Sequence, residues 1–96
     1  MKYNIYQYKL DIENLRREIN DIDTNIIDLI SKRMSIIKKI GEIKNNYQLN
    51  IIDLDRESIL QKLHHQLAIK YNLNPIFINN LFDTIIKYAR EIQKDQ

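Results

Sequence analysis

The feature that most constrains this chain is a stripe of apolar residues that extends from Tyr8 to Tyr47. Its members recur in alternating steps of four and three residues, apart from one step of seven between Leu29 and Ile36, and no proline interrupts them. They are Tyr8, Ile12, Leu15, Ile19, Ile22, Ile26, Leu29, Ile36, Ile40, Ile43 and Tyr47. This spacing is typical of a helix that packs against other helices along its length. It predicts one very long helix over about residues 7–46.

Two shorter helices are expected to follow the long one. Asp53 is a suitable N-cap for a helix over about residues 54–71, with an apolar stripe that includes Leu60. Asn74 followed by Pro75 predicts the start of a third helix over about residues 75–94. The 96 residues contain only one Gly and one Pro. We therefore expect an all-α chain that forms a single domain over residues 1–96.

The predicted first helix is too long for a compact domain of this size. About 40 residues at ~1.5 Å each span roughly 60 Å, whereas a chain of this length has a radius of gyration of only about 12–13 Å. Two shorter helices of the same chain cannot cover so long a stripe. Either the helix breaks or a second copy covers it, and we favour an intertwined homodimer because two-fold interfaces are the commonest symmetric solution.

Composition excludes several kinds of partner and chemistry. The net charge of +2, from 15 basic and 13 acidic residues, is too balanced to indicate binding of nucleic acid. The absence of Cys favours a reducing, cytoplasmic setting. Neither a signal peptide nor an apolar stretch long enough to span a membrane is expected. His64 and His65 project about 100° apart on a helix, and the sequence has no other His or Cys to complete a site, so no metal site is expected.

One cation interrupts the apolar stripe of the first helix. Arg33 stands four residues after Leu29, where an apolar side chain is expected. A buried guanidinium must form an ion pair, reach solvent or bind an anionic ligand, and position alone leaves these choices open. Lys44 follows close to three helical turns later, so the two cations share a face about 16 Å apart. That arrangement favours an anion site, although the helix dipole alone also favours a lysine near a helix C-terminus.

Further polar candidates lie in the later helices. The segment DLDRE, residues 53–57, places Arg56 in line with the apolar stripe of its helix and Glu57 beside it. Acids that favour the helix dipole and an ordinary ion pair would explain this segment without any ligand. Gln93 lies on the edge of the apolar face of the third helix, where a lone Gln is usually solvated.

Four segments in order, LRREINDID, SKRMSIIKKIGEIK, DLDRE and LFDTIIKYAREIQ, resemble the all-helical chorismate mutases over roughly residues 10–95. The resemblance implies an isomerase that rearranges chorismate to prephenate in aromatic amino-acid biosynthesis, the shikimate pathway. It also implies a homodimer that needs no cofactor. In that family, each active site is built mainly from one chain, and one Arg from the first helix of the other chain completes it.

The resemblance implies that four residues carry catalysis. Arg16 would reach across the dimer to one substrate carboxylate, and Arg33 would bind the other. Lys44 and Gln93 would donate hydrogen bonds to the ether oxygen, and Lys44 would also contact a carboxylate. Spacing supports the role across the dimer, because Arg16 and Lys44 would be ~42 Å apart in one continuous helix. A single small dicarboxylate could not touch both in one chain.

The remaining residues implied by the resemblance bind the substrate. Asp53, Arg56 and Glu57 would form the wall that positions the ring, with Glu57 accepting a hydrogen bond from the substrate hydroxyl. Ala89 stands where the family often has a small polar residue, so only its backbone or methyl group could contribute. Asn50 stands where the family commonly has a proline, which predicts a looser loop before DLDRE.

The implied reaction is a single pericyclic step. It requires a substrate held in its reactive conformer, and donors where negative charge grows on the breaking ether bond. One alternative is an isochorismate pyruvate-lyase of the same fold, which has a similar cationic pocket. Another is a non-catalytic helical dimerisation module, which leaves Arg33 in the stripe unexplained. Docking to another enzyme of the shikimate pathway is left open.

Overall fold

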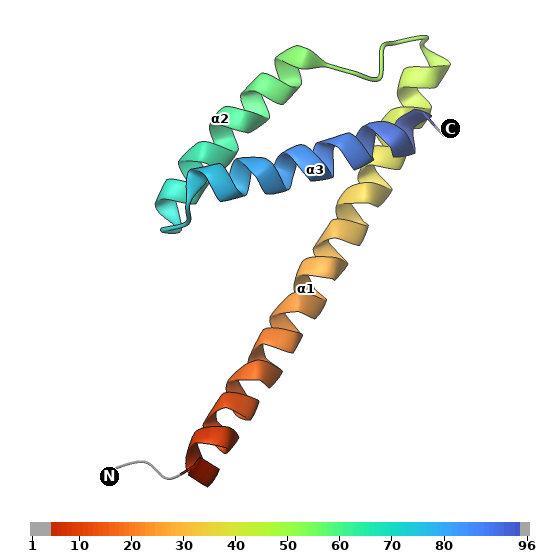
Figure 1. The fold of residues 1–96 in the computed structure, drawn as a ribbon. Coiled ribbons are helices and arrows are strands. Elements are labelled where there is room, and N and C mark those ends of the chain that lie inside the picture. Colours follow the sequence, from red (N-terminus) through yellow and green to blue (C-terminus); the bar gives the residue numbers. More distant parts are fainter. Residues whose placement is uncertain (1–4, 95–96) are drawn as a thin grey trace. The chain divides into compact units, whose positions relative to one another are not determined.

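The computed structural model describes residues 5–94, which form three α-helices and no strand (Figure 1). Helix α1 spans Ile5–Asn46, α2 spans Leu54–Lys70 and α3 spans Pro75–Lys94. The prediction of an all-α chain with one long and two shorter helices is confirmed. No helix within this range is long and apolar enough to cross a bilayer. The chain divides into two compact units, of which the first ends at Arg33 and the second begins at Met34.

Side-chain caps fix the starts of the two shorter helices. Asp53 has extended backbone angles, and its carboxylate Oδ1 accepts a hydrogen bond from the N–H of Arg56 at 3.0 Å. The Oδ1 of Asn74 accepts from the N–H groups of Ile76 at 2.8 Å and Phe77 at 3.4 Å. Each cap satisfies donors that a helix leaves unpaired in its first turn. Both N-caps expected from the sequence are therefore confirmed.

Helix α1 ends in a tight turn in which Gln48 adopts a left-handed backbone conformation, with φ of 55°. The N–H of Leu49 donates to the carbonyl of Lys44 at 2.8 Å, and that of Gln48 to the carbonyl of Asn45 at 3.3 Å. This pair of bonds is a Schellman motif, which usually places glycine at the left-handed position. The turn ends the helix without a glycine and leads the chain into the loop before α2.

The turn between α2 and α3 uses the same motif. Asn72 has φ of 56°, and the N–H of Leu73 donates to the carbonyl of Ala68 at 2.8 Å. Asparagine tolerates this left-handed conformation better than most residues. The turn is short because Asn74 already caps α3. Helices α2 and α3 are in contact (Figure 1).

The buried side chains of α2 and α3 include short and flat ones. Ala68 and Ala89 are buried. The ring of His64 is buried too and stacks on the ring of Phe82, with ring centroids 3.8 Å apart. Leu63, three residues after Leu60 on α2, remains exposed in the single chain.

Much apolar surface of α1 is exposed in the single chain. Leu15, Ile19, Ile22 and Ile26 are between 48% and 58% exposed. Exposed apolar residues are normal when scattered singly, whereas a contiguous apolar row marks an interaction surface. The stripe that predicts a long packed helix is therefore available for a partner along this part of α1.

Candidate functional site

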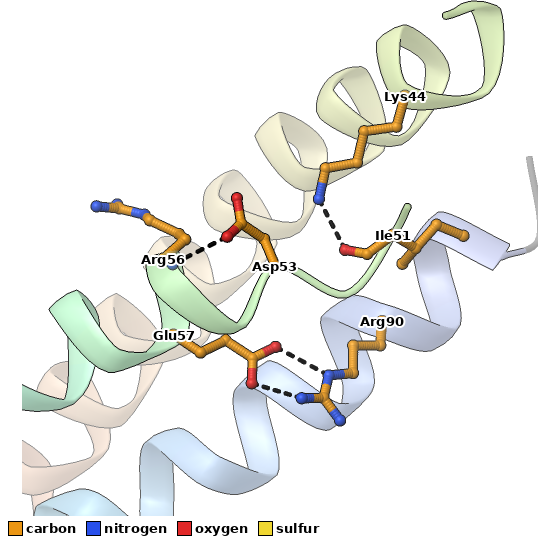
Figure 2. Close-up of polar contacts among 6 residues, drawn as sticks. All are labelled: Lys44, Ile51, Asp53, Arg56, Glu57 and Arg90. Carbon is orange, nitrogen blue, oxygen red and sulfur yellow. Dashed lines mark hydrogen bonds and ion pairs between the residues drawn. The ribbon is translucent and has the colours of Figure 1, made fainter. Parts of the chain in front are cut away.

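Lys44 is half-buried in the last turn of α1. Its Nζ donates a hydrogen bond to the carbonyl oxygen of Ile51 at 2.7 Å (Figure 2). The Schellman turn after α1 leads the loop back to within reach of this ammonium group. An ammonium has three N–H donors, so two remain after the bond to Ile51. Lys44 can hold the loop and still donate to an anion.

Asp53 and Arg56 differ in their surroundings although both lie at the start of α2. The Asp53 carboxylate is exposed and is engaged in capping the helix. Arg56 is exposed, and its guanidinium points away from the Glu57 carboxylate (Figure 2). The sequence pattern placed Arg56 in line with Leu60, which is half-buried. The long Arg side chain instead extends its charge toward solvent.

Glu57 forms an ion pair with Arg90 that links the first turns of α2 to the end of α3 (Figure 2). The Nε of Arg90 donates to Oε2 of Glu57 at 3.0 Å, and the Nη2 of Arg90 donates to Oε1. The two side chains are 25% and 28% exposed, for Glu57 and Arg90 respectively. A two-point fork of this kind fixes both the position and the rotation of a carboxylate.

Sequence reasoning did not single out Arg90. The two partners are 33 residues apart in the chain, so no helical periodicity pairs them. The available signal was the residue type, because Arg is the rarer cation in this Lys-rich chain and is suited to a bidentate grip on a carboxylate.

Ala89 and Gln93 lie one turn apart on α3, and both are buried. The Nε2 of Gln93 donates to the carbonyl of Ala89 at 3.3 Å. The Oε1 of Gln93 is also buried, and it accepts no hydrogen bond from the part of the chain that the structure describes. Periodicity alone indicated a solvated rim position for Gln93. That expectation is wrong, because the buried face of α3 continues past Ala89 into its last turn.

Arg16 and Arg33 belong to the first unit of the chain. Arg16 is exposed, and its Nη1 forms an ion pair with Oε1 of Glu13 at 2.9 Å. Exposed pairs of this kind contribute at most about 1 kcal/mol, so a stronger anion could displace Glu13. Arg33 is half-buried, as a cation within an apolar stripe would be.

A cavity of about 310 Å³ lies between α2 and α3, and both Glu57 and Arg90 line it. Its other lining residues are Leu54, Ser58, Gln61, His64, Asn79, Phe82, Asp83, Ile86 and Lys87. Glu57 is the one predicted site residue among them. The cavity is therefore not the pocket expected from the sequence, and the Glu57–Arg90 pair stands at its boundary.

The second unit thus brings together three groups. They are an ammonium with spare N–H donors, a loop that leads into a capped helix, and a carboxylate held by an ion pair. Lys44 contacts the loop at Ile51, Asp53 caps the helix that follows, and Glu57 follows one turn later. These groups can donate to an anion and accept from a hydroxyl. They are suited to binding and electrostatic stabilisation.

Comparison with known proteins adds an independent finding. The model of the family described as chorismate mutase type II matches residues 15–94. This range contains every residue that the sequence predicts for the site, from Arg16 to Gln93.

Named relatives cover most of this chain. A protein of Buchnera aphidicola subsp. Schizaphis graminum, named bifunctional chorismate mutase/prephenate dehydratase, is 41% identical over 90% of this chain and 22% of its own length. A chorismate mutase of Methanocaldococcus jannaschii is 29% identical over 86% of this chain and 84% of its own length. A 4-amino-4-deoxychorismate mutase of Streptomyces pristinaespiralis is 27% identical over 78% of this chain and 58% of its own length. The chain spans about a fifth of the length of the bifunctional relative.

Proposed function

Because this chain belongs to the type II chorismate mutase family, a family of isomerases, we propose that it rearranges chorismate to prephenate. The observation that carries the proposal is the family match over residues 15–94, which includes all the site residues. The reaction breaks an ether bond and forms a carbon–carbon bond in one step. It calls for a binding site that selects one conformer and stabilises the developing charge.

In the proposed mechanism, cations and an amide surround the dianionic substrate. Arg33 binds one carboxylate, and Arg16 of a second copy binds the other. Lys44 and Gln93 donate to the ether oxygen, on which negative charge grows in the transition state. Removing one donor of this kind typically costs about 2.7–4 kcal/mol of transition-state stabilisation. The spare N–H groups of Lys44 and the buried amide of Gln93 support this assignment.

In the same proposal, the start of α2 positions the ring of the substrate. Asp53 caps α2 and sets the path of the backbone, and Arg56 closes the outer edge of the site. Glu57 accepts a hydrogen bond from the ring hydroxyl. Ala89 contributes its backbone or methyl group beside Gln93. The carboxylate of Glu57 is held by Arg90, which supports a fixed acceptor at this position.

We also propose that the 96 residues form one domain of an intertwined homodimer. The exposed apolar stripe of α1 supports a second copy as the partner, because it continues the heptad spacing expected of packed helices. The exposed Arg16 would then be available to the site of the other chain. The absence of Cys supports a cytoplasmic setting.

We also propose that this chain docks to another enzyme of the shikimate pathway. A relative named for two activities carries prephenate dehydratase in its name along with chorismate mutase. An enzyme that consumes prephenate is therefore the kind of shikimate-pathway partner to which this chain could dock. Co-sedimentation of the purified chain with a separate prephenate dehydratase would test this.

The proposed activity is tested with two substrates in parallel. The purified chain is incubated with chorismate and, separately, with isochorismate, and the products are separated and identified. We expect prephenate from chorismate, at a rate far above that of the uncatalysed reaction. Release of pyruvate from isochorismate without formation of prephenate would instead identify a lyase. No turnover of either substrate would favour a dimerisation module.

A further inference from the structure

The ion pair between Glu57 and Arg90 carries an inference about substrate preference. We infer that Arg90 is a positioning residue, which fixes the Glu57 carboxylate and makes the site favour a neutral hydroxyl over an ammonium group on the substrate ring. The inference rests on the proposed function, in which Glu57 accepts from the ring hydroxyl. It adds Arg90 as the residue that acts through Glu57, and it adds a preference of the Glu57–Arg90 pair for a hydroxyl on the ring.

The guanidinium of Arg90 fixes the orientation of the Glu57 carboxylate. Arg90 reaches Glu57 through Nε and Nη2, so one guanidinium engages both carboxylate oxygens from one side (Figure 2). A carboxylate has about four lone-pair positions, and the fork uses two of them. Each oxygen of Glu57 therefore keeps a lone pair that can accept from a ligand. The rotation of the carboxylate is already set before a ligand binds, which lowers the entropy cost of binding.

The positive charge of Arg90 also compensates the negative charge of Glu57. The side chains of Glu57 and Arg90 are about three-quarters buried, so solvent screens the pair less than it screens exposed pairs. The charge of the carboxylate is compensated by the guanidinium at contact distance. A hydroxyl needs only a lone pair and can use this carboxylate. An ammonium is attracted most strongly by a carboxylate whose charge is not compensated, and it would also be repelled by the nearby guanidinium of Arg90.

The choice between hydroxyl and ammonium is chemically relevant to this family. One relative is named 4-amino-4-deoxychorismate mutase, a name that puts an amino group where chorismate has a hydroxyl. An alkyl amine is largely protonated near neutral pH. The pair on α2 and α3 therefore predicts that this chain uses the hydroxyl substrate in preference to the amino one.

A purely structural role is the competing explanation, because the same pair links α2 to α3. A structural link would affect both substrates equally when it is broken. If Arg90 instead positions Glu57, breaking the pair should change the ratio of kcat/KM between the two substrates. The decisive measurement is therefore kcat/KM for chorismate and for 4-amino-4-deoxychorismate with the same enzyme preparation.

The first variant is Arg90→Met, which keeps the length of the side chain and removes its charge and fork. We expect kcat/KM for chorismate to fall about tenfold, as for loss of a hydrogen bond to a charged group. We expect kcat/KM for the amino substrate to stay level or rise, so the ratio shifts about tenfold or more toward it. Lys94→Met is the matched control, because it removes an exposed ion pair, to Glu91, from the same helix. An unchanged ratio in Arg90→Met would overturn the inference.

The second measurement repeats the substitution in a Glu57→Gln background. If Arg90 acts through Glu57, Arg90→Met should change kcat/KM by less than about twofold there, since the coupling has already been removed. Additive losses would show that Arg90 acts independently of Glu57, and would contradict the inference.

Arg90→Lys keeps the inference testable if Arg90→Met does not fold. Lys retains the charge but not the fork, so chorismate turnover should fall several-fold while the ratio stays near that of the original chain. Full activity in Arg90→Lys would contradict the positioning role. The proposed function fails separately, if the unsubstituted chain does not turn over chorismate at all.

Discussion

The ammonium of Lys44 donates to the main-chain carbonyl of Ile51, with 2.7 Å between Nζ and the oxygen. This bond ties the last turn of α1 to the loop that leads into α2 (Figure 2). The path of the loop is set at one end by the left-handed turn at Gln48 and at the other by the cap at Asp53. The side chain proposed to act on the substrate therefore also holds the backbone beside it.

Substitution of Asp53 tests how the start of α2 is held. Asp53→Ala removes the acceptor of the Arg56 N–H, so the free energy of unfolding should fall by about 1 kcal/mol, within the usual range for an N-cap. Urea denaturation followed by circular dichroism measures this change.

Asp53→Asn separates capping from charge. Asn caps a helix as well as Asp does, so stability should remain near that of the original chain. A fall in kcat/KM in this variant would then isolate a role of the carboxylate toward the substrate. Equal destabilisation of the Asn and Ala variants would contradict the capping role.

The two left-handed residues offer a stability prediction. Gln48→Gly should raise the free energy of unfolding by about 0.5–1 kcal/mol, because glycine adopts φ near 55° without steric cost. Asn72→Gly should give a smaller gain, since Asn already tolerates this conformation. Thermal or urea unfolding of the two variants side by side measures the difference. A loss of stability in Gln48→Gly would mean that the turn does not require a left-handed residue.

Substitution of Gln93 by Met should raise the stability of the chain and lower its activity. Its buried Oε1 lacks a hydrogen-bond donor within the described residues, and such a group costs about 1–3 kcal/mol. Gln93→Met keeps the shape and removes the buried polar atoms, so the free energy of unfolding should rise by about 1 kcal/mol. The kcat/KM for chorismate should fall at the same time, because the amide donor is lost. Reduced stability together with retained activity would contradict both parts.

Sites shared between chains are tested by mixing inactive variants. If the chain forms the proposed homodimer, the Arg16→Ala and Lys44→Ala variants should each be nearly inactive. In a mixed dimer, one of the two sites receives an intact Arg16 and an intact Lys44, so partial activity should return. The measurement is turnover after subunit exchange, with exchange itself followed by mass spectrometry. No recovery despite complete exchange would argue against a contribution of Arg16 across the dimer.

Local features of the fold could be read from the sequence because their causes are local. Heptad spacing predicts α1, and the side chains of Asp53 and Asn74 predict where α2 and α3 begin. The pairing of Glu57 with Arg90 could not be predicted, because it depends on how α2 packs on α3. The burial of Gln93 was missed for the same kind of reason. Periodicity identifies a face of a helix, whereas burial depends on the neighbouring segment that covers it.

The roles of Arg16 and Arg33 remain predictions from the sequence. Their chemistry, two guanidinium groups for two carboxylates, is supported by the family match over residues 15–94. The exposed ion pair of Arg16 with Glu13 is weak enough to be exchanged for a ligand.

The most direct test of electrostatic catalysis by this chain is kcat/KM for chorismate in the Lys44→Ala variant. We expect a fall of at least about a hundredfold, the usual effect of losing a donor to a developing oxyanion, while the helical circular dichroism signal is retained. Lys39→Ala, which removes an exposed cation from the same helix, should remain close to the original chain. Near-original turnover by a folded Lys44→Ala variant would contradict the assignment of Lys44 and the mechanism built on it.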